Sequence, residues 1–185
     1  ERADELRALG AEIAVGDLRN FQVVRAALDG VQRAYFTYPI TDGLLEATAI
    51  FAAAGKEAGL ESMVNMSQLP ARPDHASPAS RQHWLAERLL DWSGIGVTHM
   101  RPSYFLENLI FFAAETIRAE GKIYLPYGQG RHAPVAGEDL ARVAVGILTD
   151  PAAHRGKTYV PTGPVSLSLA QMATVFTRVL GRPVE

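Results

Sequence analysis

The chain has 185 residues, 48% of them hydrophobic and 21% charged, which is typical of one globular domain and excludes a disordered or fibrous protein. Its formal net charge of -2, with no basic block, argues against nucleic-acid binding driven by bulk charge. The sequence contains no cysteine and no apolar run near the roughly 20 residues of a membrane helix, so disulfides, thiolate metal sites and membrane spans are excluded and a cytoplasmic location is predicted.

Short β-rich segments alternate with amphipathic helical segments as far as residue 120. A first helix is expected over residues 1–9, stopped by Gly10. Strands are expected over residues 13–15, 33–38, 62–66 and 97–100. Helices are expected over residues 20–30, 42–58, 79–93 and 103–120, with Asn20 as an N-cap. Strands joined by single helices are the pattern of βαβ units, so the sequence predicts a doubly wound α/β sheet of parallel strands.

The pattern changes after Gly121. Residues 122–127 are expected to be extended, and residues 128–137 to form a loop. A periodic helix over residues 138–150 and a short strand over 158–160 follow. Ser168 and Gln171 have the spacing of a capping box at the start of a last helix.

Three motif-like patterns lack the context that their chemistry needs. Residues 128–133 fit the spelling of a dinucleotide fingerprint, but Pro134 and Gly137 follow where a helix should begin, which favours a turn. Residues 156–158 resemble the end of a phosphate-binding loop, yet Pro151 stands where its first glycine is required. The five histidines show no ligand spacing, so no metal site is predicted.

Polar and aromatic residues follow the predicted strands at their carboxyl ends, where doubly wound sheets bind ligands. These ends are Asp17, residues 37–39, residues 67–68 and residues 101–104. In this order they resemble the NmrA-like branch of the short-chain dehydrogenase/reductase superfamily. The stretches that carry the resemblance are residues 16–18, 64–68, 83–87 with 93–94, 98–108, 135–144 and 156–159.

The resemblance covers essentially the whole chain and implies its organisation. Residues 1–121 would form a Rossmann-like, mostly parallel dinucleotide-binding core. Residues 122–185 would form a small mixed α/β substrate lobe and complete the sheet. The family's first strand, glycine-rich phosphate-binding turn, first helix and second strand would precede Glu1, and further elements would follow Glu185.

The resemblance also implies a cofactor, NADP or NAD, without a preference between them, and a small aromatic or conjugated substrate. Asp17 and Leu18 would lie beside the adenine, and Thr37, Tyr38 and Pro39 beside the ribose and pyrophosphate. The nicotinamide would lie near Pro102, Ser103, Tyr104 and Phe105, and Ser67 would also contact the cofactor. The substrate would lie near Gln68, Tyr104, Asn108 and Tyr127. From the residues alone, Asp17 equally suits a turn acid before Asn20, and Pro102 and Tyr104 equally suit an ordinary strand-to-helix junction.

The sequence departs from the family at the catalytic helix. Classical members use Ser, Tyr and Lys, and Ser67 is present here, but the helix from residue 79 to 87 contains neither Tyr nor Lys. His83 and Glu87 are i, i+4 neighbours, so the carboxylate would raise the pKa of the imidazole and make it a proton donor. Ser67 and His83 are therefore the catalytic candidates. The alternative is a surface ion pair on a polar helix face opposite Leu85, Leu89 and Trp92.

Two functions remain open at this point. The first is an NAD(P)H-dependent reductase of a quinone, an azo compound or another conjugated molecule, because hydride transfer to such an acceptor needs mainly proximity and orientation. The second is a regulator that senses NAD(P) without turnover, which loss of the Tyr/Lys pair would suit. A third possibility is that these 185 residues, which lack the phosphate loop, bind no cofactor by themselves. The sequence is compatible with either a monomer or a homodimer.

Overall fold

The computed structural model describes residues 2–185. The helices in chain order are α1 (Arg2–Ala8), α2 (Phe21–Ala27), α3 (Leu44–Ala58), α4 (Pro78–Trp92), α5 (Leu106–Glu120), α6 (Gly137–Thr149), the short 3₁₀ helix η1 (Pro151–Ala153) and α7 (Leu169–Leu180). The strands are β1 (Arg33–Phe36), β2 (Ser62–Met66), β3 (Gly96–Met100), β4 (Arg131–His132), β5 (Thr158–Tyr159) and β6 (Leu167–Ser168). The predicted Glu1 start of the first helix lies outside the described residues.

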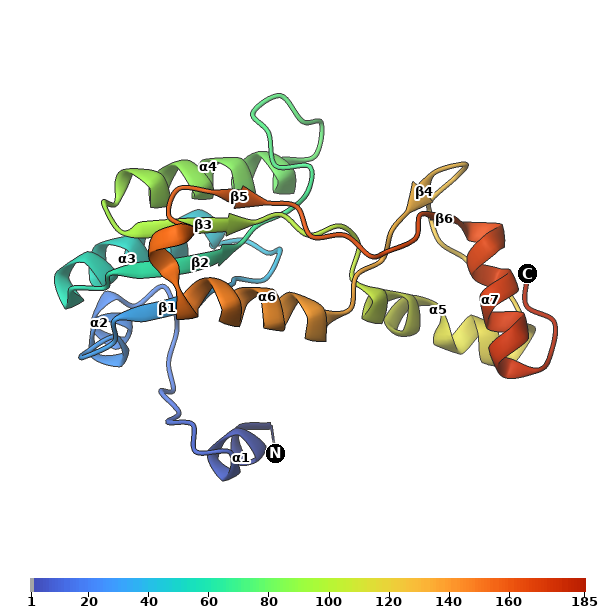
Figure 1. Cartoon of the computed structure of the whole chain (residues 1–185), viewed down its shortest axis with the longest axis horizontal. Coiled ribbons are helices and arrows are strands. Elements are labelled where there is room, and N and C mark those ends of the chain that lie inside the picture. Colours follow the sequence, from blue (N-terminus) through green and yellow to red (C-terminus); the bar gives the residue numbers. More distant parts are fainter. Residues whose placement is uncertain (1) are drawn as a thin grey trace.

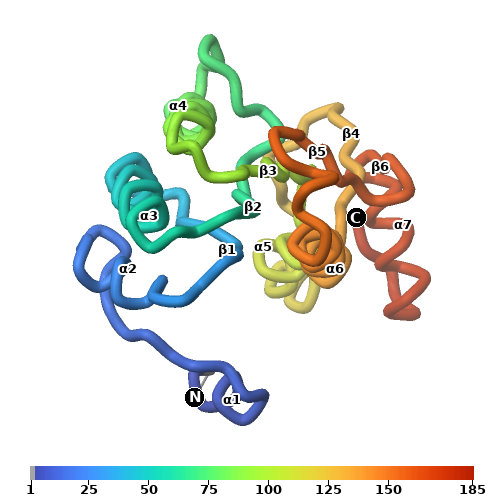
Figure 2. Tube along the Cα trace, turned by 60° about the vertical axis from the view of Figure 1, so that its left-hand side comes forward, coloured from blue at the N-terminus to red at the C-terminus, as the bar shows by residue number. Residues whose placement is uncertain are grey.

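A parallel four-stranded sheet with the order β1-β2-β3-β5 forms the centre of the molecule. Figure 2 shows α2, α3 and α4 on one face of this sheet and α6 on the other. The strands point toward the part of the molecule that contains α5, α7 and the small antiparallel pair β4–β6 (Figure 1). The doubly wound, mostly parallel Rossmann-like α/β fold is therefore confirmed.

The central strands are buried because helices cover both faces of the sheet. Met63 packs into the core beneath α2, α3 and α4, and the next residue, Val64, packs into the core beneath α6. This alternation follows from the two-residue period of a strand. A third core joins α5 to α7 through Ala113, Ile117 and Ala173.

The predicted caps stabilise the helix ends. The Asn20 side chain accepts hydrogen bonds from the backbone nitrogens of Gln22 and Val23 at 3.0 and 3.3 Å. Ser168 and Gln171 exchange both bonds of a capping box at the start of α7. Gly59 ends α3 with a φ of 78°, a conformation that glycine adopts at little cost.

The strand predicted over residues 13–15 is wrong. Within the described chain this segment has no strand partner, and the Val15 side chain is 84% exposed. Figure 1 shows the segment running alone between α1 and the sheet. Its apolar residues satisfy a strand pattern, but a strand forms only against a neighbouring edge.

The chain between β3 and α6 also differs from the prediction. Helix α5 begins at Leu106, three residues later than expected, because residues 103–105 bond to loop segments instead of starting a helix. Residues 122–127 form no strand, and Tyr127 N closes a turn on Leu125 O at 2.8 Å. The two-residue strands β4 and β6 were not predicted, since such short strands leave no periodic pattern.

Candidate active site

The carboxyl ends of β1, β2 and β3 lie side by side because the strands are parallel and in register. Ser67 follows β2, and its backbone nitrogen donates to Met100 O at the end of β3 at 2.8 Å. Arg101 follows β3 and donates its backbone N–H to Tyr159 O in β5 at 2.8 Å. These bonds hold the first residues beyond β2 and β3 in fixed positions.

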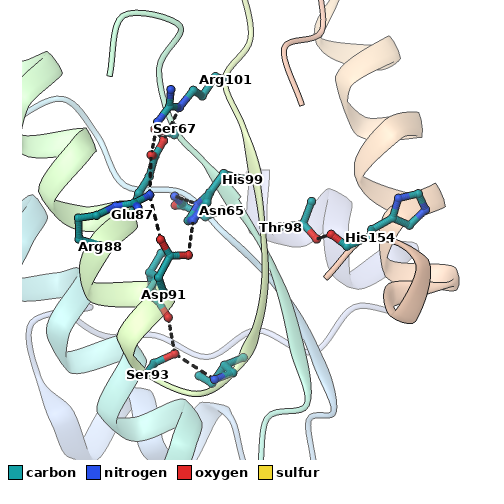
Figure 3. Close-up of polar contacts among 12 residues, drawn as sticks. Asn65, Ser67, Glu87, Arg88, Asp91, Ser93, Thr98, His99, Arg101 and His154 are labelled. Carbon is teal, nitrogen blue, oxygen red and sulfur yellow. Dashed lines mark hydrogen bonds and ion pairs between the residues drawn. The ribbon is translucent and has the colours of Figure 1, made fainter. Parts of the chain in front are cut away.

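A buried polar cluster ties these strand ends to α4 (Figure 3). The Ser67 hydroxyl donates to Glu87 Oε1 at 2.5 Å, and Arg101 Nε donates to the same oxygen at 2.8 Å. A second Arg101 nitrogen contacts Glu87 Oε2, so the arginine binds the carboxylate in a bidentate manner. Burial disfavours the charged carboxylate, but the bonds from Arg101 and Ser67 outweigh it and hold the pKa of Glu87 below its ordinary value.

The orientation of α4 is the reverse of the one that the surface ion-pair alternative requires. Its buried face consists of Ser80, His83, Ala86, Glu87 and Leu90. Leu85 and Trp92, which that alternative placed opposite the polar face, are 42% and 75% exposed. Glu87 itself is fully buried, so the alternative of a surface ion pair is wrong. The face that carries the charge packs inward because Arg101 and Ser67 neutralise and bind it.

His83 does not have the electrostatic environment expected of it. The ring is buried, and burial lowers its pKa more than the neighbouring Glu87 raises it. The Nε2 atom has no hydrogen-bond partner among the described residues. Glu87 therefore acts on His83 in the expected direction, but burial has the larger effect and favours the neutral imidazole, while the carboxylate is directed to Arg101.

A second buried chain of hydrogen bonds lies on the same helix–strand contact (Figure 3). Asn65 Nδ2 lies 3.1 Å from His99 Nδ1, and His99 Nε2 lies 3.0 Å from Asp91 Oδ1. Because the amide nitrogen is a donor, Nδ1 accepts and Nε2 carries the proton donated to Asp91. Arg88 pairs with the other oxygen of Asp91 at 2.9 Å. These residues fix α4 against β2 and β3.

Asp17 lies exposed in the turn before α2. Its carboxylate accepts from the Arg19 backbone at 2.8 Å and from the Arg19 guanidinium at 2.7 Å, and these bonds lower the pKa of Asp17 to about 2. Asn20 N also donates to Asp17 O at 2.9 Å, as the turn interpretation expects.

The end of β1 lies next to this turn. A Cβ atom added to Gly43, the N-cap of α3, would lie 3.0 Å from both Arg19 Cδ and Tyr38 Oη. The turn, the end of β1 and the start of α3 therefore converge. The other two residues of the strand end, Thr37 and Pro39, are exposed beside them, as is Leu18 in the turn.

Beyond β3, two segments thirty residues apart lie side by side. Ser103 Oγ donates to Ala133 O at 2.6 Å, and Val135 N donates to Tyr104 O at 2.9 Å. Phe105 forms a bridge with Val135. We call this contact the 103–106/133–135 pairing. Pro102 before it is buried.

The 103–106/133–135 pairing brings Tyr104 against Tyr127, with ring centroids 5.4 Å apart in an edge-on arrangement. The Tyr127 hydroxyl is buried without a hydrogen-bond partner in the described chain. Burial, reinforced by the neighbouring Tyr104, raises the pKa of Tyr127. The two remaining substrate candidates are half-buried: Gln68 directly follows Ser67 in the chain, and Asn108 lies in the first turn of α5.

Sequence reasoning missed the bond between Glu87 and Arg101 and the position of His132 beside Tyr127. A signal for the first was present: Ser80, His83, Glu87 and Leu90 recur at i, i+3, i+7 and i+10, which is one helix face. Polar residues on that face indicate a buried network as readily as a solvated surface. His132 left no such signal, since its place depends on contacts between distant segments.

Among residues 2–185, no helix has the length and apolar character needed to cross a membrane.

Comparison with known proteins gives one consistent result. The profile described as the NmrA-like family matches residues 1–185. The chain is 36% identical over 186 residues to the NAD(P)H azoreductase of Xenophilus azovorans, covering 100% of this chain and 64% of that protein.

Two solved structures share the fold over almost the whole chain. An NADPH-dependent quinone oxidoreductase from Escherichia coli, complexed with NADPH, superposes with a TM-score of 0.87 at 25% identity, over 98% of this chain and 64% of that one. The Citrobacter sp. triphenylmethane reductase complexed with NADP(H) superposes with a TM-score of 0.85 at 24% identity, over the same shares of the two chains. The chain thus spans 64% of the length of these proteins.

Proposed function

The chain belongs to the NmrA-like family, and on that premise we propose that the protein is an NAD(P)H-dependent reductase of a small conjugated acceptor such as a quinone or an azo compound. The observation that carries this proposal is the binding of the Glu87 carboxylate by Arg101 and Ser67. At the helix where classical relatives present a proton-donating pair, this chain presents a carboxylate bound to Arg101 and Ser67. An acceptor that delocalises the charge left after hydride addition suits such a site.

The residues at the strand ends fit a dinucleotide. Gly43 opens α3 with a φ of 96° and no side-chain cap, and a side chain there would fill the space beside Tyr38 and Arg19. Backbone N–H groups at a helix start suit a phosphate group. Asp17 and Leu18 would hold the adenine, and residues 37–39 the ribose and pyrophosphate. When bound, the reduced nicotinamide supplies a hydride.

The chain's own residues would orient the reaction. Ser67 donates its single hydroxyl proton to Glu87, so toward a ligand it offers only oxygen lone pairs. Pro102, Tyr104 and Phe105 supply an apolar wall that suits a flat ring and limits access of water. Gln68, Asn108 and Tyr127 are the proposed substrate contacts, and the buried Tyr127 hydroxyl, which has no partner among the described residues, would bond to a substrate oxygen or nitrogen once the substrate reaches it.

The test is consumption of NADPH and NADH, followed at 340 nm, with a panel of benzoquinones, naphthoquinones and azo dyes. We expect consumption that depends on the acceptor. A matched binding experiment measures the affinity for NADP and NAD by calorimetry. Binding without consumption would support the alternative, an NAD(P)-sensing regulator, and overturn the reductase.

A further inference from the structure

We propose that His132 donates the proton that completes reduction of the conjugated acceptor. This inference rests on the proposed function, in which no residue at the strand ends was assigned as the proton donor. Ser67 has committed its proton to Glu87, and burial favours neutral His83. A proton donor must therefore come from another segment or from water.

The fold holds His132 beside the segment that follows β3, next to Tyr104. The next residue, Ala133, accepts the Ser103 hydroxyl at 2.6 Å and the Gly163 N–H at 3.0 Å, so both sides of the loop are anchored. His132 itself pairs with Leu167 in the β4–β6 ribbon. Its position is thus set by one side-chain bond, from Ser103, and by backbone bonds to two other segments.

The ring of His132 packs on the aromatic residues proposed to face the substrate. Its centroid lies 4.1 Å from that of Tyr127, with the planes inclined by 38°, and 6.0 Å from that of Tyr104. These two phenol rings are the titratable groups that face it. The neighbouring Arg131 is directed away, with its guanidinium donating to Ser166 O at 2.6 Å.

Neither ring nitrogen of His132 has a hydrogen-bond partner among the described residues. In the described part of the chain, His75, His99 and His154 all hydrogen-bond through the ring, and His83 is buried. His132 is only half-buried and has no such partner. An imidazole that is held by stacking and has no protein partner on either nitrogen can hydrogen-bond a ligand and pass it a proton.

The step balances as follows. A hydride from the reduced nicotinamide brings two electrons and one hydrogen to the acceptor, and the substrate oxygen or nitrogen becomes an anion. The His132 imidazolium N–H bond breaks as the new O–H or N–H bond forms. Water then returns a proton to the neutral imidazole.

The kinetic test uses the full chain with NADPH and 1,4-naphthoquinone. His132→Ala is expected to lower kcat about 100-fold, the low end of the contribution of a general acid, and added imidazole is expected to restore part of the rate. His132→Gln should lose the rate with no recovery, because its side chain occupies the space. The control, His75→Ala, removes an imidazole from the loop between β2 and α4 and should change neither the rate nor its response to imidazole.

A binding test separates this proposal from the proposed function. In the absence of coenzyme, 1-naphthol should shift the NMR signal of the His132 ring, assigned by its loss in His132→Gln, and leave that of His75 in place. A folded His132→Ala variant that keeps its kcat, or a naphthol titration that leaves His132 unmoved, would overturn the role of His132. If the wild type consumes no NADPH with any acceptor, the proposed function fails, and the naphthol titration alone then decides whether His132 contacts the ligand.

Discussion

Glu87 is a charged side chain with no exposure to water, and its stability depends on Arg101. Glu87→Gln keeps the shape of the side chain but leaves the arginine without its counter-charge. We expect the free energy of unfolding, measured by denaturant titration, to fall by about 3 kcal/mol. The matched control is Glu138→Gln, which breaks an exposed pair with Arg142 and should cost about 0.5 kcal/mol or less. Equal losses in the two variants would contradict the role of burial.

The same pair has a predictable pH dependence. Because Arg101 and Ser67 lower the pKa of Glu87 in the folded state, its contribution is complete above the ordinary value of 4.5 and is lost as the pH falls through the lowered folded value. The difference in stability between wild type and Glu87→Gln should therefore be constant from pH 6 to 8 and shrink in acid. A difference that grows in acid would show that the carboxyl group is protonated in the native protein.

Tyr127 carries a buried hydroxyl with no bond to another described residue. Such a group costs stability, so Tyr127→Phe should raise the free energy of unfolding by about 1 kcal/mol. If the hydroxyl is kept for a substrate, the same variant should raise KM for the quinone and leave KM for NADPH unchanged. Tyr124→Phe is the control, since its hydroxyl is exposed and bonds to Glu120 at 3.0 Å. A destabilised Tyr127→Phe would mean that the hydroxyl has a partner.

At the scale of elements, helix periodicity predicted α4 within a residue or two at each end but did not decide whether the face with His83 and Glu87 packs inward or meets solvent. The pattern of Leu85, Leu89 and Trp92 satisfies a hydrophobic stripe, and only the packing against Ser67 and Arg101 selects the other face. Local patterns predicted the strand ends and the caps, because these depend on neighbouring residues. The bond between Glu87 and Arg101 and the stacking of His132 depend on segments far apart, so the sequence alone could not predict them.

The orientation of α4 predicts that two substitutions on this helix change the free energy of unfolding by very different amounts. Trp92→Gln removes a large apolar side chain that is exposed and should change the free energy of unfolding by about 0.5 kcal/mol or less. Leu90→Ala, two residues earlier and fully buried, should cost about 3 kcal/mol. Denaturant titration of both variants measures the difference, and a larger cost at Trp92 would support the orientation of the surface ion-pair alternative.

At the scale of the molecule, the two parts of the chain share the central sheet and the core beneath α6. β5 pairs with β3 and supplies the acceptor for Arg101 N, while Val64 and Met100 pack against Leu140 and Ile147 of α6. A fragment of residues 1–121 would therefore expose the edge of β3 and one apolar face of the sheet. The boundary near residue 121 marks a change of pattern in the chain, and the contacts across it argue against two independent folding units.

We expect the whole chain to unfold in one cooperative transition that is the same by far-UV circular dichroism and by tryptophan fluorescence, and the fragment 1–121 to show none. Both tryptophans, Trp84 and Trp92, lie on α4, so the fluorescence reports on the sheet half, whereas the dichroism reports on all the helices. Two separated transitions, or a cooperatively folded fragment, would show that the sheet of β1, β2 and β3 is stable without β5 and α6. In that case the core beneath α6 would contribute to the site by positioning the 103–106/133–135 pairing rather than by holding the fold together.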